Sequence, residues 1–357
     1  MTDLLYSDVE ESLRASLASA LARVLPDPGA TAALYDDPDS DVSAVWTMLA
    51  DQLGLAALLV PERHGGAGAS PREAAVVLEE LGKTVAPAPF LTSAVIATTA
   101  LSAVGDAPRL ERLAAGQATA ALVVPWSARA GQWTATAEGE DVQPVAGAIE
   151  ADILVVPVTD AEGLALRIYQ AGEATVAPLT SLDMTRPLAS VAVSGPGTVV
   201  ARDDQARQAV DSALLAGQSL LASEQYGLAR QCLQLTVEYA TTRIQFARPI
   251  GSFQAIKHRL ADLYLQVIQA GAVARYAADT VARADEDAPV ASALAQAYCS
   301  DVAVKAAEEA LQLHGGIGMT WEHPLHLYLK RAKADQLALG TASRHREDLA
   351  ELVGLVA

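Results

Sequence analysis

Apolar residues recur at helical spacing through the region from residue 203 to 357. The clearest case begins near Ser252, where successive apolar positions are three and four residues apart in alternation, so that they share one face of a helix. These positions are Phe253, Ile256, Leu260, Leu263 and Val267. Other long periodic segments cover 205–242, 288–313 and 325–337. Helices of these lengths predict a C-terminal four-helix bundle with antiparallel neighbours.

Residues 1–118 also predict helices. An amphipathic helix is expected over 3–25, where prolines follow its end, and further apolar helical segments cover 42–59 and 91–101. Ser70 precedes Pro71 and lies three residues before Glu73, which is the pattern of a capping box at the start of another helix. The sequence therefore predicts an N-terminal helical domain.

Residues 119–202 have a different pattern. Short apolar runs of strand length occur at 120–124, 152–156, 166–169 and 191–193, and Gly, Pro, Asp and Thr separate them. Short strands at this spacing predict a small antiparallel β-barrel or sandwich. The expected fold class is thus α+β and mainly α, with a middle β-barrel domain over 119–202 between the N-terminal helices and a bundle over 203–357.

Composition and charge limit the range of partners. The chain is 51% hydrophobic but only 4% aromatic, and its formal net charge is −18. The negative charge argues against binding to nucleic acid or to an anionic membrane surface. The first residues, MTDLLYSDVEESL, lack the basic region and apolar run of a secretory signal, and Cys232 and Cys299 have no partner motif. We therefore expect a cytoplasmic protein with no membrane span and no metal site.

Two long motifs carry specific information. The first is YATTRIQFARPIGSFQAIKHRLAD at 239–262, and the second is QLHGGIGMTWEH at 312–323. Two weaker ones are VPE followed by GGAG at 60–68, and SLDMTR at 181–186. With the order of helices, strands and helices, these motifs closely resemble the acyl-CoA dehydrogenase family over nearly the whole chain. The resemblance implies that family's fold and a function in the α,β-desaturation of an acyl-CoA thioester.

The resemblance also implies FAD as cofactor. Arg243 ends a long helix, where a cation interacts favourably with the helix dipole, but its guanidinium also suits a pyrophosphate. The glycines at 315 and 316 suit a helix C-cap and equally a close approach of the backbone to a cofactor. In the family the matching positions contact the adenosine and pyrophosphate of a flavin seated mainly in the neighbouring subunit. The corresponding residues here are Arg243, Gln245, Phe253, Gln254, Gln312, Gly315, Gly316 and Thr341.

The family's catalytic glutamate has no counterpart. In most members it precedes a Gly-Thr pair, but Leu339 precedes Gly340–Thr341 in this chain and cannot accept a proton. Other members place the base on the first bundle helix, at the position of Gly217. The nearest carboxylates are Glu224, two turns along that helix, and Asp335, one turn before Leu339. The simpler interpretation of each is a polar residue at a seam, and no catalytic residue is assigned.

A second departure concerns the loop that hydrogen-bonds the flavin ring in the family. Its usual Thr-Glu-Pro and Gly-Ser-Asp pattern is replaced by VPWSARAG at 124–131. Trp126 and Trp133 in this region either contact a flavin or fill the core of the β domain. The half of the site that would hold the flavin ring is therefore altered, whereas the half that would reach a neighbouring subunit is retained.

These features predict a non-catalytic subunit of a hetero-oligomeric acyl-CoA dehydrogenase, arranged as α2β2. A homologous catalytic subunit would supply the glutamate, bind most of the acyl-CoA and contact the flavin ring, and an electron-transfer flavoprotein would accept the electrons. The resemblance points to bulky steroid-derived CoA thioesters. Two alternatives remain: a self-sufficient homotetramer with a relocated base such as Glu224, and a flavin-free scaffold.

Overall fold

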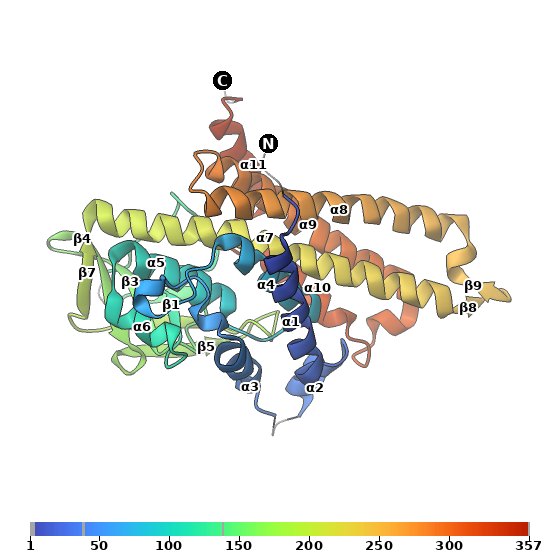
Figure 1. Cartoon of the computed structure of the whole chain (residues 1–357), viewed down its shortest axis with the longest axis horizontal. Coiled ribbons are helices and arrows are strands. Elements are labelled where there is room, and N and C mark those ends of the chain that lie inside the picture. The colour runs from blue at the N-terminus through green and yellow to red at the C-terminus, as the bar shows by residue number, and fades with distance from the viewer. Residues whose placement is uncertain (1–3, 38–39, 138, 356–357) are drawn as a thin grey trace.

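The computed structural model describes residues 4–37, 40–137 and 139–355, and it divides into helices, two small sheets and a long helical bundle (Figure 1). The 40-residue helix α7 (Asp203–Thr242) runs along most of the molecule and links these parts. The sheets lie at one end of α7, and a small hairpin projects from the other end (Figure 1). Within the described residues, no helix combines the length and apolar character needed to cross a membrane.

The N-terminal part is helical, as predicted. Ser70 caps α4 (Pro71–Thr84) through the predicted capping box with Glu73, and Ser7 with Glu10 forms a second one that starts α1 (Asp8–Val24). The predicted start of that first helix, Asp3, lies outside the described residues. The apolar segment after residue 90 begins as a π-helix (Phe90–Ala97) before it becomes regular. The remaining α-helices are α2 (Ala30–Asp36), α3 (Ser43–Thr47), α5 (Thr98–Val104) and α6 (Ala107–Ala114).

Strands β1 to β7 form two sheets with the orders β1-β3-β4-β7 and β2-β6-β5. Alternate apolar side chains of both sheets meet in one core that contains Leu154, Tyr169 and Val191. The prediction of an antiparallel arrangement is wrong for one pair, because β1 runs parallel to β3. The strands are β1 (Ala120–Leu122), β2 (Val142–Ala146), β3 (Ile153–Asp160), β4 (Gly163–Gln170), β5 (Ala174–Leu179), β6 (Leu188–Val193) and β7 (Thr198–Arg202).

The C-terminal part is a helical bundle that follows the predicted segments closely. Besides α7 it contains α8 (Gln254–Ala282), α9 (Ala288–His314) and α10 (Leu325–Leu337). Two further elements were not predicted: α11 (Ala342–Leu352), which packs on α9, and a hairpin of β8 (Ile244–Gln245) and β9 (Arg248–Pro249). The fold class is thus confirmed, while the division into domains at residues 118 and 202 stays a prediction.

Two glycines let the N-terminal helices touch the bundle. A Cβ at Gly227 of α7 would lie 2.0 Å from the carbonyl oxygen of Glu79, and a Cβ at Gly82 of α4 would lie 2.2 Å from the carbonyl oxygen of Glu224. These helices therefore meet backbone to backbone, one glycine from each. This close approach fixes where Glu224 stands in the core.

We expect Gly227→Ala to lower the free energy of unfolding by about 1–3 kcal/mol, because the added methyl group overpacks a contact made by backbone atoms that cannot turn away. Urea denaturation measures the change. Gly172→Ala is the matched control, because a Cβ there meets nothing within 4 Å. Equal stability of the two variants would contradict this account of the helix contact.

Candidate functional site

Leu339, the residue predicted to stand in place of the family's base, has an unusual backbone. It lies between α10 and α11, is 1% exposed, and has a φ of 52°, a left-handed conformation that is costly for leucine. Its N–H donates to the carbonyl oxygen of Trp126 at 2.7 Å, and its own carbonyl accepts from Nε2 of His345 at 2.9 Å. The backbone is therefore held in place, although the side chain can only pack.

The space next to Leu339 is closed. The cavity there has a volume of about 10 Å³, and Trp126, Ile96 and Leu339 are among the residues that line it. Gly217, the second position at which a base was considered, packs against residues of the same cavity. A Cβ at Gly217 would lie 2.8 Å from two side-chain carbons of Ile96 and 3.2 Å from Cδ1 of Leu339. Neither position carries a carboxylate, and this small cavity is too small for a thioester or a flavin ring. A larger cavity of about 590 Å³ shares Thr92 with it as a lining residue and is also lined by Glu150 and Arg186.

We call the small cavity lined by Trp126, Ile96 and Leu339 the closed centre. The loop after β1, which contains Trp126, is held in place by hydrogen bonds and an ion pair. The N–H of Trp126 donates to the carbonyl oxygen of Pro144 at 2.7 Å, and Arg129 forms an ion pair with Asp348 of α11 at 2.7 Å. Further along, the N–H of Gly131 and Nε1 of Trp133 both donate to Asp211 of α7, at 2.8 and 2.6 Å. The two tryptophans thus have different roles: Trp126 lines the closed centre, and Trp133 binds the loop to α7.

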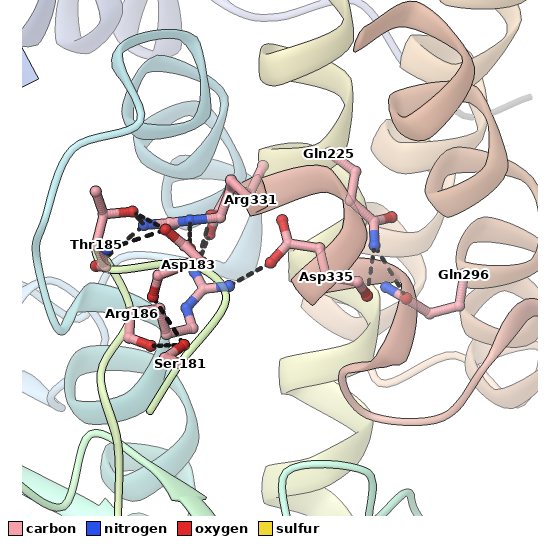
Figure 2. A network of polar contacts seen from close by, with 9 residues as sticks. Ser181, Asp183, Thr185, Arg186, Gln225, Gln296, Arg331 and Asp335 are labelled. Carbon is pink, nitrogen blue, oxygen red and sulfur yellow. Dashed lines mark hydrogen bonds and ion pairs between the residues drawn. The ribbon is translucent and has the colours of Figure 1, made fainter. Parts of the chain in front are cut away.

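Figure 2 shows a cluster of charged side chains around Arg186 and Arg331. Arg186, from the loop before β6, binds both oxygens of Glu224 through Nη2 at 2.8 Å and binds Asp335 through Nη1. Arg331 of α10 binds Glu224 and Asp183. All five side chains are less than a tenth exposed. The cluster joins the β domain to α7 and α10, and its three carboxylates outnumber its two guanidiniums.

The cluster decides the protonation of both weak candidates for a base. Burial opposes the ionisation of Glu224, but the adjacent guanidiniums of Arg186 and Arg331 outweigh burial and hold its pKa below the usual range. Burial raises the pKa of Asp335 to about 8, and repulsion from Glu224 acts in the same direction. Glu224 is therefore a carboxylate engaged with two arginines, a geometry that argues against it as a relocated base.

The predicted dinucleotide contacts gather at the far end of the bundle. Arg243 and Gln245 are exposed at the hairpin, and Phe253 and Gln254 start α8 beside it. The glycine turn lies nearby, because the ring of His314 stacks on Tyr239, in the last turn of α7, with centroids 4.3 Å apart. The turn contributes three exposed residues, Gln312, Gly315 and Gly316.

Thr341 lies apart from the other predicted contacts. Its hydroxyl caps α11 by accepting from the N–H of Arg344 at 3.4 Å, next to the closed centre. The hairpin of β8 and β9 and the helix α11, which Thr341 caps, lie at separate places in the molecule (Figure 1). One chain therefore does not bring all of its predicted cofactor contacts to a single site.

The structure adds two residues that the sequence analysis passed over. Phe246 and Arg248 lie within the first motif, and both are exposed, Phe246 at 87%. Phe246 and Ala247 both have positive φ at the tip of the hairpin, which is the geometry of a two-residue turn that usually carries Asn or Gly. A large apolar side chain held out on such a turn is a signal that sequence pattern alone did not reveal.

Comparisons with known proteins show the family of the chain. The family models "Acyl-CoA dehydrogenase, N-terminal domain" and "Acyl-CoA dehydrogenase, C-terminal domain" match residues 7–119 and 207–354. The acyl-CoA dehydrogenase IpdE2 of Mycolicibacterium smegmatis is 39% identical over 334 residues, which are 94% of this chain and 95% of that protein.

Solved structures share the fold. A chain of the ChsE4–ChsE5 complex of Mycobacterium tuberculosis superposes with a TM-score of 0.87 at 24% identity, over all of both chains. A chain of the Tcur3481–Tcur3483 steroid ACAD, in its G363A variant, gives 0.82 at 21% identity, over 98% of each chain. At these identities the likeness concerns the fold.

Asp335→Asn tests the protonation of the cluster. The pKa of Asp335 is about 8 in the folded state, above its ordinary value of 3.8. Between pH 3.8 and pH 8, folding therefore takes up a proton. The contribution of Asp335 to stability falls as the pH rises through this range. The neutral amide removes this dependence. From pH 5 to pH 8, urea denaturation should show the variant gaining at least about 1.4 kcal/mol relative to the wild type. Parallel curves would mean that Asp335 stays ionised in the folded state.

Proposed function

Because the chain belongs to the acyl-CoA dehydrogenase family, we propose that it is the non-catalytic subunit of a hetero-oligomeric acyl-CoA dehydrogenase. The observation that carries the proposal is the contrast between a closed centre at Leu339 and an open, positively charged hairpin at the other end of the bundle. The chain would contribute phosphate and adenosine contacts to a flavin whose ring lies in a related subunit. That subunit would supply the base and bind most of the acyl-CoA.

The residues of this chain fit one half of FAD and not the other. The exposed arginine, glutamines and aromatic ring near the hairpin suit a pyrophosphate and a nucleoside. The centre at Leu339, with about 10 Å³ of free space, does not accommodate a three-ring flavin. When bound, the flavin supplies the acceptor for the hydride that leaves the β-carbon of the thioester. This chain would position the dinucleotide and would take no part in moving the α-proton.

The location of the proposed cofactor contacts supports a partner subunit. Arg243 and Gln245 lie on an exposed projection, apart from the centre of their own chain, so a flavin that they bind has its ring elsewhere. We propose a homologous catalytic chain in an α2β2 assembly, with an electron-transfer flavoprotein as acceptor. A chain of a two-protein complex with the same fold, ChsE4–ChsE5, supports such an assembly.

For the substrate we propose a bulky, steroid-derived CoA thioester. The proposal is supported by the structural neighbour described as a steroid ACAD, which shares the fold over 98% of each chain. The self-sufficient alternative would require a base near Leu339, and the candidate Glu224 is engaged by Arg186 and Arg331. A flavin-free scaffold would have no use for Arg243 and Arg248, which form no ion pair within the described part of the chain.

The test is reconstitution with a second acyl-CoA dehydrogenase chain of the same organism, one that has glutamate at the position of Leu339. Neither chain alone should oxidise acyl-CoA, whereas the mixture should. With Arg243→Ala in this chain, activity at limiting FAD should fall about tenfold or more, because a charge-assisted contact to the pyrophosphate is lost.

Arg63→Ala is the control, because Arg63 is an exposed arginine in a loop of the N-terminal part and should leave activity unchanged. Full activity of the Arg243→Ala mixture at limiting FAD would contradict the proposed contribution to the cofactor. Activity of this chain alone would contradict the need for a partner.

A further inference from the structure

The hairpin presents three polar side chains on one face. Gln245 pairs with Arg248 across the two strands, and the ladder continues with the N–H of Ile250 donating to the carbonyl oxygen of Arg243 at 2.9 Å. Side chains alternate along a strand, and directly paired residues share a face. Arg243, Gln245 and Arg248 therefore lie on the same side, while Ile244 lies on the other.

Both guanidiniums on this face are available. Arg243 and Arg248 are exposed, and neither forms an ion pair with any carboxylate in the part of the chain that the structure describes. This is notable in a protein with a formal net charge of −18, where most arginines near the domain seams are paired. Two unpaired cations on one small face form a local site for an anion of more than one charge.

Arg248 is also held in position. Its guanidinium carbon lies 4.0 Å from the centre of the ring of Phe253, a distance typical of a cation–π contact. Phe253 in turn meets Phe246 edge to face, with centroids 6.2 Å apart. The two aromatic rings therefore fix Arg248 beside the turn, and Phe246 remains exposed next to it.

We infer that Arg248 is a second phosphate-binding residue, which with Arg243 forms a two-guanidinium clamp for a diphosphate and makes this site selective for a dinucleotide or nucleoside diphosphate over a monophosphate. The inference rests on the proposed function and extends it to specificity. Each guanidinium binds one phosphate group through parallel N–H donors, and Gln245 donates between them. Exposed Phe246 offers a surface on which a purine base stacks.

The experiment uses the full chain without a partner, with ADP and AMP as probes, and measures binding by saturation-transfer NMR titration at low salt. The wild type should bind ADP about tenfold more tightly than AMP, because only ADP has a second phosphate group for the second guanidinium to bind. Arg248→Ala should abolish this preference and leave AMP affinity nearly unchanged. Arg230→Ala, which removes an exposed arginine elsewhere on α7, should keep the preference.

Two results would overturn the inference. One is equal binding of ADP and AMP by the wild type, or no binding of either, and the other is an Arg248→Ala variant that retains the preference for ADP. Both leave the proposed function intact, because that is tested by activity with the catalytic chain and by Arg243→Ala. Conversely, a chain that prefers ADP but gives no activity with any homologous partner would support the clamp and contradict the proposed function.

Discussion

The buried contact between Arg186, Arg331 and three carboxylates is the interaction on which the rest of the site depends. These residues come from the loop before β6 and from helices α7 and α10, so the cluster sets the position of the β domain on the bundle. Removing one member of such a cluster leaves a buried charge without a partner, which commonly costs about 3–5 kcal/mol. Arg186 also lies 5.6 Å from the centre of the Trp126 ring, so the same cluster supports the residue that lines the closed centre.

Under the proposed function, the closed centre and the open hairpin together would explain how a chain with this fold lacks a base and still takes part in a flavoenzyme. At Leu339 the backbone keeps a strained, left-handed conformation and two hydrogen bonds, but the side chain only fills space. At the hairpin Arg243 and Arg248 are exposed, and neither guanidinium forms an ion pair with a carboxylate among the described residues of its own chain. The chain thus has the family fold but lacks part of the proposed site. In the proposed function, a second subunit would supply the missing base and the contacts to the flavin ring.

Local patterns predicted most of the fold because they act over one or two turns. The segment 325–337 matches α10, 288–313 differs from α9 by one residue, and the capping box at Ser70 starts α4 as expected. The parallel pairing of β1 with β3 has no local signal, because it joins residues 33 positions apart, such as Ala120 with Ile153. The short helix α11 was missed because few of its residues are buried.

The candidate site, like the fold, could be predicted from the sequence only in part. The absence of a carboxylate at Leu339 and the motif around Arg243, for which we propose phosphate binding, were visible in the sequence, since each is a matter of residue identity. The partners of Glu224 were not, because Arg186 is 38 residues away and Arg331 is 107 residues away. The closure of the centre by Trp126, Ile96 and Leu339 likewise depends on three segments that meet only in the folded chain.

The central claim is that this chain does not hold a working flavin by itself. The most direct test is to purify the chain alone and record its visible spectrum before and after adding a range of acyl-CoA thioesters, including steroid-derived ones. The account predicts no bound flavin, or flavin that no thioester bleaches. A stoichiometric flavin that an acyl-CoA bleaches would contradict it, and would mean that the centre at Leu339 opens and that another residue acts as the base.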